Sequence, residues 1–247
     1  MIYHVVRLPL LYHFADRSDW YARLLCIALV SFLWSIPAFS QALGYTSLIT
    51  VPSADMPADG SVTFGGGFVD KKYTTYVEGI DYTPYYVTVQ FLPFLEGTLR
   101  FSRLVKFDRQ NISRVGDRVV MGRIRVLEEK GTRPGVVLGA HDFITAERGK
   151  FFNALYVVAS KHVRIGLPIG FHLGYGTDAI DSVGHQFVGV FGGMAVAALP
   201  HTLLMIEFDG DRVNAGARFS LVDHFQVMAG LQGMDVLIAG ASIRVQL

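Results

Sequence analysis

Apolar and polar residues alternate along most of the chain after residue 42. In YYVTVQF (85–91) the apolar side chains share one face, and LIAGASIRVQL (237–247) repeats this period of two. Such a period is the signature of a β-strand with one apolar face, and no amphipathic helix of any length interrupts it. The runs predicted as strands are 61–71, 83–92, 95–105, 117–127, 135–143, 151–161, 167–176, 187–198, 202–209, 212–221, 225–233 and 236–247. Most are about ten residues long, as tilted transmembrane strands are.

The connections between these runs alternate in length. They are tight after the second, eighth and tenth runs, and longer and polar after the first, third and seventh. Membrane barrels have short periplasmic turns and longer outer loops, and an even strand number leaves both ends in the periplasm. Two connections depart from this rule, because EEKGTRP (128–134) is long for a turn and DGD (209–211) is short for a loop. The predicted fold is all-β, an antiparallel transmembrane β-barrel of about twelve strands over residues 61–247.

Composition agrees with this fold class. Hydrophobic residues make up 51% of the 247, charged residues only 17%, and there are 26 glycines and 18 phenylalanines. The mean hydropathy of +0.36 is high for a soluble domain. A net charge of +1 gives no global field that would attract nucleic acid. The single cysteine, Cys26, excludes a disulfide framework and a cysteine-based metal site.

The first 42 residues have the layout of an export signal with an extended leader. A basic residue precedes the apolar stretch 24–36, and Pro37 then leads to small residues around Ser40 and Ala42. The stretch is short for a membrane-spanning helix. We predict a cleavable signal peptide and a place in the outer membrane of a Gram-negative bacterium. An uncleaved anchor, or a start codon assigned too early, are the alternatives.

Residues 43–60 form a plug-like segment in this interpretation. Two prolines, Pro52 and Pro57, fix φ and lack an N–H group, so the segment is not a ladder strand. Its SLIT stretch (47–50) is too apolar for a free tail, which favours a place in the barrel lumen. The central plug residues are Pro52, Ser53, Ala54 and Asp55. The glycines of GGGF (65–68) are not followed by a helix, so they form no nucleotide site and are expected to give room for the plug or a sharp bend.

The same opening stretch resembles a known family. GYTSLITVPSADMPADGSVTF (44–64) is similar to the start of the YjbH-like outer-membrane proteins, which are linked to exopolysaccharide production in Gram-negative bacteria. Further segments resemble that family in the same order, namely 87–102, 133–144, 155–163 and 205–211. The resemblance covers about residues 44–247 and implies a short, single-barrel member with a role in exopolysaccharide production or export.

Charged residues recur on the predicted inward faces. They are Arg100, Arg123, Arg125, Glu207, Asp209, Arg212, Arg218 and Arg244. Two interpretations stay open. The charges could line a polar lumen that holds or passes a carbohydrate or an anion, or they could form internal ion pairs in a narrow, filled barrel.

Other polar groups give weaker signals for chemistry. Glu207, Asp209 and Asp211 do not have the spacing of an EF-hand loop, and an Asp-Gly-Asp turn explains them more simply. In the pairs 141–142 and 161–162, adjacent strand residues point to opposite faces, so neither pair is predicted to share a site. No Ser/His/acid arrangement stands out, and no basic patch interleaved with aromatic residues suggests nucleic acid. We therefore predict no catalytic residue, no metal and no cofactor.

The leading hypothesis is a non-enzymatic outer-membrane β-barrel protein involved in exopolysaccharide production or export. Its expected partners are outer-membrane lipid, polysaccharide and other exopolysaccharide secretion proteins. The alternatives are a general porin or small-solute channel, a barrel enzyme acting on lipid or sugar, and a soluble barrel anchored by the N-terminal segment. The last alternative requires polar outward faces, whereas the predicted outward faces are apolar.

Overall fold

The computed structural model describes residues 47–73, 81–105, 115–143, 153–177, 179, 187–222 and 224–247. The predicted signal peptide, residues 1–42, lies outside these residues, as do residues 43–46 of the plug-like segment. The strands are β1 (Ser61–Val69), β2 (Asp81–Leu92), β3 (Leu95–Val105), β4 (Val115–Leu127), β5 (Gly135–His141), β6 (Ala154–Ile165), β7 (Leu167–Thr177), β8 (Gly189–Leu199), β9 (Thr202–Phe208), β10 (Val213–Val222), β11 (Phe225–Gln232) and β12 (Val236–Gln246). A short 3-10 helix, η1 (Lys71–Tyr73), follows β1. Within the described residues, we find no helix with the length and apolar character needed to cross a membrane.

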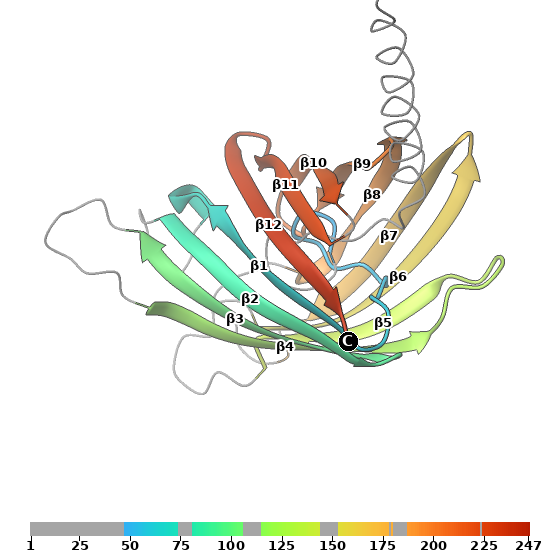
Figure 1. Ribbon diagram of the computed structural model, residues 1–247, viewed down its shortest axis with the longest axis horizontal. Coiled ribbons are helices and arrows are strands. Elements are labelled where there is room, and N and C mark those ends of the chain that lie inside the picture. Colours follow the sequence, from blue (N-terminus) through green and yellow to red (C-terminus); the bar gives the residue numbers. More distant parts are fainter. Residues whose placement is uncertain are drawn as a thin grey trace, which may run out of the picture. The chain divides into compact units, whose positions relative to one another are not determined.

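The strands form one closed ring (Figure 1). Each strand pairs with its neighbours in sequence, and β1 pairs antiparallel with β12, which closes the barrel. The N–H group of Leu247 donates to the carbonyl of Gly60 at 3.0 Å, so the two ends of the sheet meet at one rim. The prediction of a twelve-stranded antiparallel barrel is confirmed. Closure leaves no unpaired sheet edge, which removes the usual route to edge-to-edge aggregation.

The predicted strand bounds agree with the structure to within two residues except at β6. That strand was expected to end at residue 161 but runs to Ile165. Polar residues at 162 and 164 break the apolar pattern there, yet the pairing continues until Ile165 faces Leu167. Gly166, at a φ of 73°, makes the whole turn between β6 and β7, in a conformation that glycine adopts without strain.

The outward face of the barrel is apolar. Its exposed side chains include Leu173, which is 64% exposed, and Val190, which is 57% exposed. Outward aromatic residues lie near the rim of the longer connections (Tyr85, Phe101, Tyr175, Phe208) and near the rim of the short turns (Phe91, Phe94, Phe219), with Phe64 and Phe171 between them. An apolar band with aromatic residues at both ends is what a lipid-facing barrel surface requires. It argues against the soluble, anchored alternative, because a soluble protein rarely exposes an apolar area of this extent.

Inward-facing aromatic rings lie over glycines on the neighbouring strand. The register pairs Gly65 with Tyr86, and a Cβ added at Gly65 would lie 2.3 Å from Cζ of that ring. Gly66 lies on the outer face of β1, next to the outward ring of Tyr85. The expectation that GGGF makes room for the plug is therefore wrong for Gly65, because the ring of Tyr86 occupies the space on its inward side.

The pair formed by Gly139 and Tyr156 allows a stability test. A Cβ at Gly139 would lie 2.1 Å from Cζ of the buried Tyr156 ring. We expect Gly139→Ala to cost about 1–3 kcal/mol, because overpacking forces the ring from its place. The control is Gly97→Ala, since a Cβ there meets only Phe91, at 3.8 Å. The measurement is the temperature at which the folded band on an unboiled gel converts to the unfolded one, and equal temperatures for the two variants would contradict the expectation.

Candidate functional site

The barrel interior holds the chain segment 47–60, which we call the inner segment. Its residues 47–52 form a small hairpin, in which Ser47 pairs with Pro52 and the Leu48 N–H donates to the Val51 carbonyl at 2.8 Å. Leu48, Ile49 and Val51 are at most 3% exposed. The predicted plug residues Pro52, Ser53 and Ala54 are buried, and Asp55 is half-buried.

Two glycines of the wall make room for this hairpin. A Cβ added at Gly193 would lie 2.5 Å from Cδ1 of Leu48, and one at Gly216 would lie 3.1 Å from Cδ1 of Ile49. Glycines of β8 and β10 therefore make room for the inner segment. The sequence had predicted this role for the glycines of GGGF (65–68) in β1.

A buried carboxylate holds the tip of the hairpin. Glu207 Oε2 accepts the N–H groups of Ile49 (2.9 Å) and Val51 (3.1 Å), and Oε1 accepts the N–H of Thr50 (2.9 Å). Oε1 also accepts the Thr50 hydroxyl at 2.6 Å and Asn214 Nδ2 at 2.9 Å. A buried charge is costly unless hydrogen bonds satisfy it, and here consecutive backbone amides serve that purpose.

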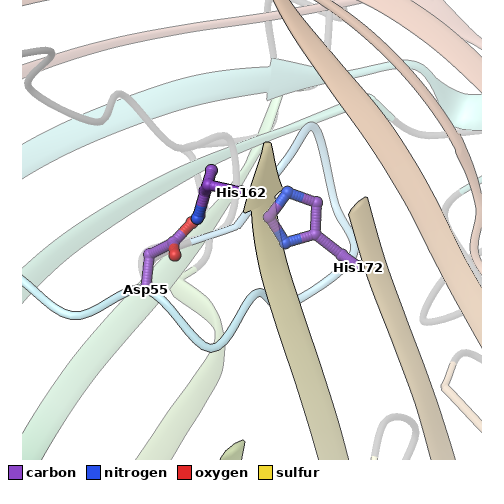
Figure 2. Close-up of side chains that lie close together, drawn as sticks. All are labelled: Asp55, His162 and His172. Atoms are coloured by element: carbon purple, nitrogen blue, oxygen red, sulfur yellow. The ribbon is translucent and has the colours of Figure 1, made fainter. Parts of the chain in front are cut away.

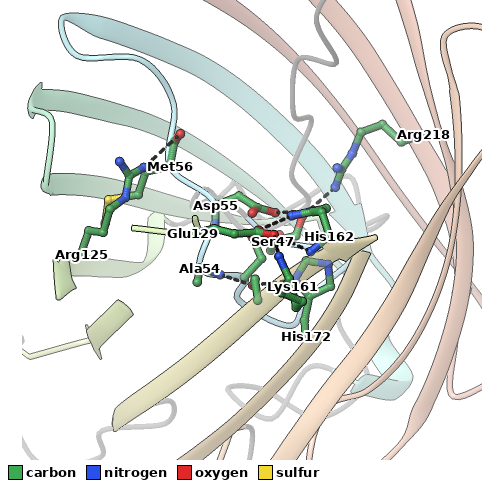
Figure 3. Close-up of polar contacts among 12 residues, drawn as sticks. Ser47, Ala54, Asp55, Met56, Arg125, Glu129, Lys161, His162, His172 and Arg218 are labelled. Atoms are coloured by element: carbon green, nitrogen blue, oxygen red, sulfur yellow. Dashed lines mark hydrogen bonds and ion pairs between the residues drawn. The ribbon is translucent and has the colours of Figure 1, made fainter. Parts of the chain in front are cut away.

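Arginines of the wall bind the carbonyl groups of the same segment. Arg218 Nη2 donates to the carbonyl of Ser47 at 2.8 Å, and Arg125 Nη2 donates to that of Met56 at 3.4 Å (Figure 3). Arg123 Nη2 donates to the carbonyl of Ser53. Charged side chains of the wall therefore bind both kinds of backbone group in the inner segment. Glu207 accepts N–H groups, and the arginines donate to carbonyl groups.

Arg123 also belongs to a buried ion pair. Its Nη1 lies 3.0 Å from Oε1 of Glu96, and both side chains are 1% exposed. Glu96 was not among the predicted site residues. It sits in LEGTLRFS, whose alternation places Glu96 on the same face as Arg100, so the strand pattern contained the signal.

The other predicted lumen charges have different surroundings. Arg100 and Asp209 are buried, and Arg212 and Arg244 are partly buried. Asp209 accepts the N–H groups of Asp211 (3.0 Å) and Arg212 (2.8 Å), so it stabilises the turn after β9. Arg212 lies in that turn rather than on the inward face of a strand, with its guanidinium 4.2 Å from the ring centre of Tyr73. Arg244 Nε donates to Thr63 Oγ1 at 3.1 Å.

The connection 128–134 brings a further carboxylate, that of Glu129, into contact with β6. Glu129 accepts Lys161 Nζ at 2.6 Å, and its other oxygen lies 2.7 Å from His162 Nδ1. Partial burial alone would raise the pKa of Glu129, but the hydrogen bonds from Lys161 and His162 outweigh it and lower that pKa to about 2. In the sequence, the unusual length of this connection was the sign that its residues make contacts of their own.

A serine and a histidine are also in contact beneath the inner segment. Ser160 Oγ lies 2.7 Å from His172 Nδ1 and accepts the N–H of Ala54 at 2.7 Å. Neither residue is among the predicted lumen and plug residues. Ser160 is 1% exposed, so the inner segment covers the hydroxyl that a nucleophile would have to present.

The prediction that neither adjacent pair shares a site is wrong for Lys161 and His162, because both contact the carboxylate of Glu129. His141 and Asp142 also depart from the expected geometry. The predicted strand runs through residue 143, but β5 ends at His141 and Asp142 has a φ of 55°. Both side chains are buried, at 1% and 2% exposure, so they do not lie on opposite faces of a strand.

A closed antiparallel barrel with an apolar exterior, a charged interior and a chain segment bound inside has the architecture of transmembrane β-barrels. The chain belongs to the YjbH family, since the family model described as exopolysaccharide biosynthesis protein YbjH matches residues 40–193. This confirms the family resemblance, although the match does not include the 205–211 segment quoted for it. A search of curated proteins found no match.

Three of the segments that carry the resemblance meet inside the barrel. The opening segment supplies the backbone amides of residues 49–51 and of Ala54. The segment 155–163 supplies Ser160, and the segment 205–211 supplies Glu207. The opening segment and Ser160 lie within the matched residues 40–193, so the family similarity covers part of the contact between the inner segment and the wall, whereas Glu207 lies outside the match.

Proposed function

We propose that this protein is a non-enzymatic outer-membrane barrel that acts in the production or export of exopolysaccharide, and that the inner segment is a plug in its lumen. Membership of the YjbH family and the apolar outer band support the proposal. The proposal includes a cleaved export signal and a lipid environment. It also includes contact with polysaccharide or with other secretion proteins.

The observation that carries the proposal is the binding of the inner segment by Glu207, Arg123 and Arg218. A general porin would keep such charges in contact with water and solute. Here they bind backbone groups of the protein's own chain, which favours a closed or regulated barrel over a permanent diffusion channel. Burial of Ser160 beneath Ala54 likewise favours a non-enzymatic role over the hydrolase alternative.

The test is deletion of the gene in a Gram-negative strain that carries it. We expect secreted exopolysaccharide to fall and the wild-type gene to restore it, while Glu207→Gln restores it only in part. Released and cell-associated polysaccharide are measured separately, because an export defect shifts material toward the cell and a synthesis defect lowers both. Unchanged exopolysaccharide in the deletion strain would overturn the proposed role.

A second experiment tests the proposed place in the outer membrane. The protein should fractionate with the outer membrane, and the unboiled protein should migrate differently from the boiled one, because a folded barrel resists detergent until it is heated. The measurement is gel migration with and without boiling on separated inner and outer membranes. Recovery in the inner membrane with unchanged migration would contradict the outer-membrane assignment.

A further inference from the structure

Three potential metal ligands lie together where the inner segment meets β6 and β7. They are Asp55 of the inner segment, His162 of β6 and His172 of β7, and one ligand atom of each lies within 4.8 Å of the others (Figure 2). The Asp55 Oδ2 to His162 Nε2 distance is 3.8 Å. The group thus joins one side chain of the inner segment to two of the wall.

The Nε2 atoms of both imidazoles lie close to the same residue, Gly170. A Cβ added at Gly170 would lie 2.9 Å from Nε2 of His162 and 3.0 Å from Nε2 of His172. Because Gly170 has no side chain, no Cβ of this residue crowds the two nitrogens. The register agrees, since His162 pairs directly with Gly170, and His172 follows it on the same face of β7.

The remaining ring nitrogens are held by hydrogen bonds. His162 Nδ1 lies 2.7 Å from Glu129 Oε2, and His172 Nδ1 lies 2.7 Å from Ser160 Oγ. Metal-binding histidines typically use their second nitrogen in this way, with a carboxylate as a frequent partner that fixes the ring and strengthens the ligand. With the proton on Nδ1, each of these contacts orients its ring and leaves Nε2 free to bind a metal.

We propose that Asp55, His162 and His172 form a site for a divalent transition-metal ion, with zinc the best fit, and that bound metal fastens the inner segment to the wall. Two imidazole nitrogens and one carboxylate oxygen suit zinc and leave a fourth position for water. Bonds of about 2.1 Å place tetrahedral ligands roughly 3.4 Å apart. The side chains reach that spacing by small movements, which half-exposed His162 and half-buried Asp55 can make. The proposal stands on these side chains alone and does not depend on a role in exopolysaccharide production.

The test is calorimetric titration of zinc chloride into the purified, folded, full-length barrel, without a histidine tag and after treatment with a chelator. We expect one ion per barrel with micromolar or tighter affinity at neutral pH. Asp55→Asn, His162→Gln and His172→Gln should each weaken binding at least tenfold. The matched control is His224→Gln, because His224 is exposed in the turn before β11.

Thermal unfolding supplies a second readout. A hundredfold excess of zinc over its dissociation constant should raise the unfolding temperature by roughly 5–10 °C, and a chelator should reverse the rise. Absence of zinc binding to the wild-type barrel would overturn the proposal even if every variant failed to fold. Binding that His224→Gln weakens as much as the three ligand variants do would overturn it as well. Neither result would bear on the exopolysaccharide phenotype, so the two proposals fail independently.

Discussion

Replacement of Glu207 by glutamine is expected to make a closed barrel conduct ions. The carboxylate accepts three consecutive backbone N–H groups and the Thr50 hydroxyl, all of them buried. Glutamine keeps the shape but offers one carbonyl oxygen, and its NH₂ group faces donors rather than acceptors. Loss of the charge-assisted bonds should weaken docking of the hairpin by about 3 kcal/mol, which raises the released fraction roughly a hundredfold.

The measurement is ion conductance after reconstitution into planar bilayers. Wild-type protein should be closed for most of the recording, whereas Glu207→Gln should show frequent or sustained openings. Deletion of residues 47–56 should give the largest and steadiest conductance, since the barrel strands begin only at Ser61. The control is Glu128→Gln, because Glu128 is exposed in the turn after β4. A large steady conductance of the wild-type protein would instead favour the porin alternative.

The strands could be predicted closely because a barrel imposes a simple rule on its sequence. In a membrane barrel the outward positions face an apolar medium and many inward positions carry polar side chains, so alternation recurs along most of the strands. The rule failed at β6, where His162 and Arg164 look like turn residues. Glu129 binds His162, so a contact between residues 33 apart in sequence permits charged residues within the strand.

The interior contacts were harder to predict than the strands. Alternation placed Glu207, Arg123 and Arg218 on inward faces, but it could not say what they contact. Their partners lie 158, 70 and 171 residues away along the chain, in the inner segment. Such pairs depend on how far the hairpin enters the barrel and how it is turned. Neither quantity is encoded in a local period of hydrophobicity.

The second large effect is expected at the buried ion pair of Arg123 and Glu96. Replacement of Arg123 by leucine leaves the Glu96 carboxylate buried without this partner and removes the bond to the carbonyl of Ser53. Loss of one partner of a buried pair typically costs about 3–5 kcal/mol, because the other charge is then uncompensated. For a chain of this size, that should lower the unfolding temperature by roughly 10 °C.

The measurement is the temperature at which the unboiled band disappears from gels, supported by circular dichroism in detergent. Arg125→Leu is the matched control, since Arg125 lies two residues further along β4, is half-buried, and makes a 3.4 Å contact with the carbonyl of Met56. Its loss should cost less than about 1 kcal/mol. The double variant Arg123→Leu/Glu96→Leu should recover part of the stability, because it removes the buried carboxylate that has lost its bond to Arg123. If the double variant were less stable than Arg123→Leu alone, Glu96 would stabilise the barrel through other contacts, and the ion pair would not be the source of the effect.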